Sequence, residues 1–333
     1  MEHETMHANL RRRGSIDRLP GPTAALRAAS FGAAALFVAA ALLVAACTAG
    51  AGPTPPPSPT VSPSAPPASG PPGSTLEHPD GPTEVVLRFE ESGGLMPPGF
   101  LATTAPIFTL YGDGSAIFRD PAATVDEASA TKPAGVYLMA PFRIARLPEQ
   151  AVQSLLAWAI GPGGLGAARA GHYDTPGVAD APTSTFELHA GGLDKRVEVY
   201  ALGIEGVQVG EGDQEVRRSL ASLRERLLAF DAAGATSVTI WRPERYRATL
   251  VAGTPAEGIE PLAWPWPTIG PADFVPPAEP GLPSWPRRVL TAEEVSRLGV
   301  RPFEGGFTGL WLRAPDGTRH ALTVRPLLPD EAA

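Results

Sequence analysis

The segment between residues 171 and 183 carries the polar side chains with the clearest chemical potential. It holds His172, Asp174 and Asp180 just before an expected strand. An imidazole and two carboxylates in one loop could bind a hard cation or form a general acid–base pair. Asp, Thr and Gly are also the residues with which turn-rich loops hydrogen-bond their own backbone. No third or fourth metal ligand is evident, so we favour the turn interpretation.

Aromatic residues gather in a second segment, among the prolines of residues 255–286. Trp264, Trp266 and Trp285 lie there with Phe274. Exposed tryptophans stack on sugars or dock partner proteins, so these rings are candidate binding residues. Large rings in extended segments are more often packing anchors. We favour packing and keep binding as the alternative.

Composition and motifs exclude several function classes. The chain has 27 basic and 35 acidic residues and a net charge of −8, without a basic block, which argues against a nucleic-acid partner. One cysteine excludes an internal disulfide and a cysteine-based zinc site. No G-x-S-x-G elbow, P-loop, dinucleotide fingerprint, H-E-x-x-H or EF-hand loop occurs. The sequence therefore predicts no cofactor or metal, apart from the lipid considered next.

The first fifty residues have the pattern of an export signal. Arginines at 11, 12, 13, 18 and 27 precede an uncharged, apolar stretch from Ala28 to Ala46, which ends in small residues. The sequence Val44-Ala45-Ala46-Cys47 resembles the lipobox of bacterial lipoproteins. This resemblance implies cleavage before Cys47, a diacylglycerol on its thiol and an acyl chain on its new amino group. It also implies attachment to the extracytoplasmic face of the cell membrane through the lipid.

An uncleaved transmembrane anchor is the alternative, because about 20 apolar residues can span a bilayer. A flexible tail directly after Cys47 favours the lipoprotein. Ten prolines lie between Pro53 and Pro72, separated by Ser, Thr, Ala and Gly. Such a segment cannot bury enough apolar surface to fold and favours extended polyproline II, so we expect a disordered spacer.

From about residue 83 the sequence alternates as strands do, punctuated by turns. Three hairpins are predicted, with strands at 107–111 and 115–118, 185–189 and 196–200, and 309–313 and 320–324; single strands are predicted at 84–89 and 245–251. Apolar residues at helical spacing after Pro148 predict one helix. Asp213 is the expected cap of a longer second helix, and Thr291 with Glu294 forms the capping box of a short third one. Because strands and helices do not alternate, the predicted class is α+β: antiparallel hairpins with two main packed helices.

These patterns predict five segments. They are a signal peptide (1–46), a lipidated cysteine with a Pro-rich spacer (47–82), a main α+β domain (83–253), a Pro/Trp-rich connection (254–287) and a C-terminal helix and hairpin packed on the main domain (288–333). The connection is either an interdomain linker or an ordered crossing. Whether the last segment shares the core of the main domain stays open.

Four stretches also resemble a family of uncharacterised lipoproteins of high-GC Gram-positive and related bacteria. They are 110–114, 176–183, 199–203 and 325–331. The resemblance covers the chain from about residue 83 and implies a shared fold and location, but no activity. We therefore expect a surface-anchored lipoprotein that binds or scaffolds in the cell envelope without catalysis, with a wall polymer or an envelope protein as partner. The alternative is an envelope hydrolase, metal-assisted, that uses residues 172–180.

Overall fold

The computed structural model describes residues 75–120, 123–277 and 285–331, all within one compact unit of the chain, Ala68–Ala333. The predicted export signal, Cys47 and most of the predicted spacer lie outside these residues. Four α-helices and fourteen strands, in largely antiparallel sheets, are present in the described part and confirm the predicted α+β class. Within the described ranges, no helix combines the length and the apolar character needed to cross a bilayer.

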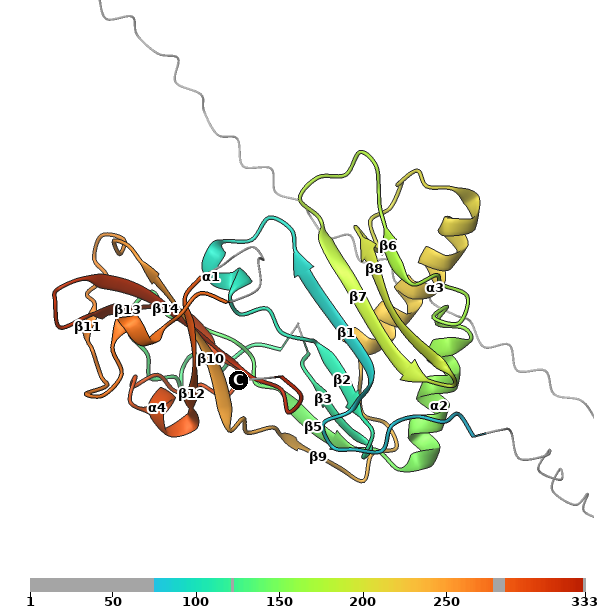
Figure 1. Cartoon of the computed structure of the whole chain (residues 1–333), viewed down its shortest axis with the longest axis horizontal. Helices are drawn as coiled ribbons and strands as arrows, with labels where there is room; N and C mark the ends of the chain where they lie inside the picture. Colours follow the sequence, from blue (N-terminus) through green and yellow to red (C-terminus); the bar gives the residue numbers. More distant parts are fainter. Residues whose placement is uncertain (1–74, 121–122, 278–284, 332–333) are drawn as a thin grey trace, which may run out of the picture. The chain divides into compact units, whose positions relative to one another are not determined.

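Eight strands form the larger sheet, in the order β6-β8-β7-β1-β2-β3-β5-β9 (Figure 1). Their bounds are β1 Val85–Gly93, β2 Phe108–Tyr111, β3 Ser115–Phe118, β5 Arg143–Arg146, β6 Gly171–Tyr173, β7 Pro182–Ala190, β8 Leu193–Tyr200 and β9 Ser237–Ile240. Neighbouring strands are antiparallel except β6 and β8, which are parallel. The β2–β3 and β7–β8 hairpins confirm two of the three predicted from their turns, and the third pairs residues 307–313 with 319–326 in the second sheet.

Two helices cover one face of this sheet (Figure 1). Helix α2 spans Glu149–Ile160 and α3 spans Glu211–Leu228. Their buried apolar residues recur every three or four positions and pack on the strands, as an amphipathic helix requires; they are Val152, Leu155, Leu156, Ala159, Leu220, Leu223 and Leu227. Helix α3 begins two residues before its predicted cap: Gly210 is the N-cap, and Asp213 lies within the first turn.

The chain enters this unit earlier than the predicted domain start at residue 83. The side-chain amide of Gln153 on α2 accepts a hydrogen bond from the Leu76 backbone nitrogen at 2.8 Å and donates one to the Leu76 carbonyl at 2.9 Å. The Gly191 nitrogen donates to the Glu77 carbonyl at 2.7 Å. The last residues of the predicted spacer therefore pack against α2 and the β7–β8 turn.

Five strands follow one another in the second sheet, in the order β11-β13-β14-β10-β12, and β4 pairs with β13 to give the sixth. The bounds are β4 Tyr137–Leu138, β10 Arg245–Ala252, β11 Leu262–Ala263, β12 Arg287–Thr291, β13 Phe307–Arg313 and β14 Arg319–Pro326; short helices are α1 Pro98–Leu101, η1 Pro271–Asp273 and α4 Ala292–Ser296. Thr291 and Glu294 form the predicted capping box of α4. Strand β10, which the sequence groups with the main domain, pairs with β12 and β14 of the C-terminal segment.

Candidate functional site

The polar side chains of the 171–183 segment contact residues of the segment itself and of the neighbouring strand β8. His172 lies in the edge strand β6, half exposed, with its Nδ1 3.7 Å from Glu198 Oε2. Asp174 is exposed and accepts a hydrogen bond from the neighbouring Thr175 nitrogen at 2.8 Å. Asp180 is exposed and takes a left-handed backbone conformation with φ of 56°. These local contacts match the turn interpretation that the sequence favours.

The described residues contain no group of three or more His, Cys, Asp and Glu side chains that could hold a metal ion. The loop is instead held by Arg217 of α3, which is 6% exposed. Its Nη2 donates to the Thr175 hydroxyl at 2.6 Å and to the Tyr200 carbonyl at 2.7 Å. Residues 174–175 are therefore fixed to the end of β8.

The candidate binding tryptophans belong mainly to the core of the second sheet. Trp266 is 3% exposed, and its indole donates to the Glu294 carbonyl at 2.9 Å. Trp264 is partly buried, packs edge-on against Trp266 with ring centroids 5.4 Å apart, and donates to the Ile269 carbonyl. Trp285 is also partly buried. Residues 254–277 are thus an ordered crossing pinned by its rings.

A polar surface that the motifs did not reveal lies on the other face of the large sheet, opposite α2 and α3. Residues directly opposite each other in neighbouring strands share a face, so the register defines two rows across it. The first row is Thr109, Arg88, Glu187 and Arg196, on β2, β1, β7 and β8; the second is Glu90, Thr185, Glu198 and His172, on β1, β7, β8 and β6. We call these two rows the charged face.

Ion pairs connect most of the charged face. Arg88 Nη1 lies 3.7 Å from Glu187 Oε2, and Arg196 Nε donates to Glu198 at 2.9 Å. His189, two residues beyond Glu187 on β7, contacts Glu187 through Nε2 at 3.0 Å and Asp194 through Nδ1 at 2.9 Å. Charges of opposite sign therefore alternate along and across the strands.

Glu90 differs from its neighbours on the charged face. No hydrogen bond or ion pair joins its carboxyl group to another described residue. Burial raises the pKa of Glu90, and Arg325, Arg196 and Arg88 only partly oppose the rise. Glu90 is only partly buried, and its oxygens are not among the fully buried, unpartnered polar atoms of the described part, which are Arg119 Nε, Arg217 Nη1 and Arg288 Nε.

One side of the charged face is bounded by residues 327–331, which we call the C-terminal clasp. Asp330 Oδ1 accepts hydrogen bonds from Arg88 Nη2 and from the Tyr111 hydroxyl, both at 2.7 Å. Burial, together with the carboxylate of Asp330, raises the pKa of Tyr111. Leu328 is buried beside Tyr111 in a small apolar cluster on this face. Asp330 therefore joins the clasp to β1 and β2 of the large sheet.

The next residue joins the clasp to the second sheet. Glu331 accepts a two-pronged hydrogen bond from Arg325 of β14, with its oxygens 2.8 and 2.6 Å from Nη1 and Nη2. Its backbone carbonyl accepts from Arg245 of β10 at 3.1 Å. Burial alone would raise the pKa of Glu331, but the hydrogen bonds and charge of Arg325 outweigh it and the pKa is lowered. Two adjacent carboxylates thus tie the two sheets together beside Glu90.

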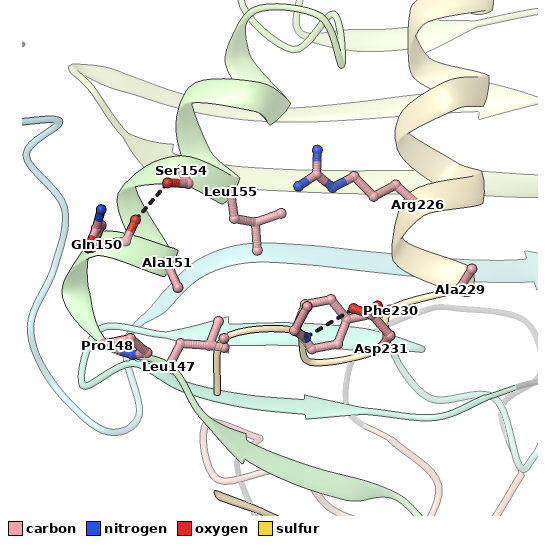
Figure 2. A pocket seen from close by; sticks show the side chains of 12 residues that line it. Leu147, Pro148, Gln150, Ala151, Ser154, Leu155, Arg226, Ala229, Phe230 and Asp231 are labelled. Carbon is pink, nitrogen blue, oxygen red and sulfur yellow. Dashed lines mark hydrogen bonds between the residues drawn. The ribbon is translucent and has the colours of Figure 1, made fainter. Parts of the chain in front are cut away.

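An open groove of about 770 Å³ lies on the helical side, between the start of α2 and the end of α3 (Figure 2). Leu147, Leu155 and Phe230 supply apolar walls. Arg226 extends from α3 along one wall, and its guanidinium stacks over the Trp158 ring at 4.4 Å. The groove is a hydrophobic hollow with a polar rim, and nothing in the described residues indicates what would cover it.

Comparisons with models of protein families, with curated proteins and with solved structures gave no match for this chain. Its function must therefore be inferred from its own residues and geometry. The charged face is the stronger candidate, because it combines donors, acceptors and an unpaired carboxyl group on rigid strands.

Proposed function

We propose that this chain is a lipid-anchored protein of the extracytoplasmic face of a bacterial cell membrane. Its α+β unit serves as a non-catalytic binding or scaffolding module in the cell envelope. The anchor rests on the sequence: the apolar stretch before Cys47, the small residues at 45 and 46, and the Pro-rich spacer that follows. Such an anchor and spacer would hold the folded unit close to the envelope polymers.

The charged face is the observation that carries the binding role. It spans five adjacent strands and presents guanidinium, carboxyl and imidazole groups on one rigid surface. Ion pairs fix the directions of several of these groups, so a partner would meet preorganised donors and acceptors. A wall polymer or an envelope protein offers matching polar groups. The acidic character of the face does not suit nucleic acid.

Sedimentation with isolated cell walls tests this role. The full-length protein, purified in detergent, should sediment with the walls. The Arg196→Glu variant should lose most of that association, because Arg196 is 57% exposed and reversing its charge places three carboxylates side by side with Glu187 and Glu198. Arg218→Glu is the matched control, since Arg218 is exposed on α3, away from the charged face.

Equal sedimentation of wild-type and Arg196→Glu protein would place binding elsewhere. A loss in both variants would indicate a general effect of net charge. No sedimentation of the wild-type protein would contradict binding to the wall.

A further inference from the structure

Glu90 has free capacity to accept hydrogen bonds, whereas its neighbour on the same strand, Arg88, is already engaged. An ionised carboxyl group has about four lone-pair positions for acceptance, and none is used by another described residue. Arg88 is fully engaged: it donates to Thr109 at 3.3 Å and to Asp330 at 2.7 Å and lies 3.7 Å from Glu187. The Glu90 carboxyl group lies between the strands and the C-terminal clasp. It is therefore available to accept a hydrogen bond from a ligand.

A free donor lies on the same face of the sheet as this acceptor. Arg196 uses its Nε for Glu198, and its two terminal nitrogens make no hydrogen bond to a described residue. Arg196 lies on the same face of the sheet as Glu90, diagonally across β7 in the register, and its charge acts on the Glu90 carboxyl group. A ligand between them would meet an acceptor on one side and donors on the other. Hydroxyl groups can satisfy both, because each one donates and accepts.

The charge of the surface restricts the ligand further. Within the charged face and the adjoining β7–β8 turn, Arg88 and Arg196 stand against four carboxylates, those of Glu90, Glu187, Asp194 and Glu198. Arg325, which also acts on Glu90, is already paired with Glu331. A polyanion would be repelled by this excess of negative charge. The five strands together span about 19 Å, from a spacing of about 4.8 Å between neighbours, which accommodates an extended ligand of several rings.

We infer that the charged face is a saccharide-binding site, that its ligand is a neutral, hydroxyl-rich glycan of the cell wall, and that Glu90 accepts and Arg196 donates hydrogen bonds to its hydroxyl groups. This inference rests on the proposed function and narrows it to one chemical class. It assigns Glu90 a binding role and involves no bond breaking.

Calorimetric titration of the full-length protein with N-acetylglucosamine oligomers tests the inference. The wild-type protein should bind, and Glu90→Gln should weaken binding by about tenfold or more, because a hydrogen bond to a charged acceptor is replaced by a neutral one. Glu211→Gln is the matched control: Glu211 is exposed in the first turn of α3, and its substitution should leave the affinity unchanged. Glucuronate oligomers of similar length should bind much more weakly than the neutral oligomers.

A second measurement excludes misfolding as the cause. Because burial raises the pKa of Glu90, its ionised form disfavours the folded state at neutral pH. Glu90→Gln should therefore raise the Tm at pH 7 while it weakens binding. If Glu90 only supported the fold, the substitution would lower both the Tm and the affinity for the saccharide.

Three outcomes would overturn the inference. The first is equal affinity of wild-type and Glu90→Gln protein, and the second is preference for glucuronate or for lysine oligomers. The third is no saccharide binding by a protein that still sediments with cell walls; the proposed function would then survive, with a different ligand class. Failure of both assays would count against both proposals.

Discussion

Replacing Glu331 by alanine is expected to destabilise the folded protein by about 3–5 kcal/mol, the cost of breaking a buried ion pair from one side. Its partner, Arg325, has a side chain only 5% exposed and would keep its charge without the carboxylate. The Leu328 nitrogen would also lose its acceptor, at present 2.8 Å away. Denaturant unfolding of the full-length variant measures the loss.

Glu260→Ala provides the control for this prediction. Glu260 is 92% exposed and lies 4.0 Å from Arg313, a surface pair that should contribute little. We expect its removal to change the unfolding free energy by less than about 0.5 kcal/mol. If both variants were equally stable, the clasp would not hold the two sheets together.

The ion pair between Glu331 and Arg325 also predicts how the stability of the protein depends on pH. The pKa of Glu331 is lowered in the folded state from its ordinary value of 4.5. The folded protein therefore takes up this proton at lower pH than the unfolded chain. The stabilisation that ionised Glu331 gives to the folded state is fully present above about pH 4.5. It is lost as the pH falls through the pKa that Glu331 has in the folded protein. The stability difference between wild-type protein and Glu331→Gln should shrink over that range.

Replacing Cys47 by serine is expected to abolish lipid attachment. The thiol is the group that receives the diacylglycerol in the lipoproteins that the Val44–Cys47 sequence resembles. Cells grown with labelled palmitate should label the wild-type protein and leave Cys47→Ser unlabelled and uncleaved. Loss of two or three acyl chains, each CH₂ contributing about 0.8 kcal/mol, removes a stable anchor.

Thr48→Ala is a suitable control, because it alters the neighbouring residue and keeps the thiol. It should be labelled and processed normally. Normal processing of Cys47→Ser would contradict the lipoprotein assignment and favour an uncleaved membrane-spanning segment.

The sequence reveals those parts of the fold that depend on local chemistry. The β2–β3 and β7–β8 hairpins could be predicted because glycines mark their turns. Gly114, Gly191 and Gly192 take there the positive φ that glycine adopts most easily, 81° at Gly114. Short strands such as β5 and β9 were missed, since four residues carry too little alternation to stand out.

The charged face was missed for a different reason. The β7–β8 turn sets Glu187 opposite Arg196, so half of it could have been found from that register. The pairing of β1 with β7 is not local, and only this pairing brings Glu90 beside Thr185. The 171–183 segment could be interpreted locally, because its polar residues serve a turn and a short edge strand.

Hydroxyl-radical footprinting of the full-length protein with solubilised wall fragments tests the central claim most directly. Oxidation of side chains reports which surface the ligand covers. The account predicts reduced oxidation of His172 and His189, which lie on or beside the charged face, and unchanged oxidation of Trp158 and Phe230 near the groove. Protection of Trp158 and Phe230 with His172 and His189 unprotected would contradict it and move the binding site to the groove between α2 and α3.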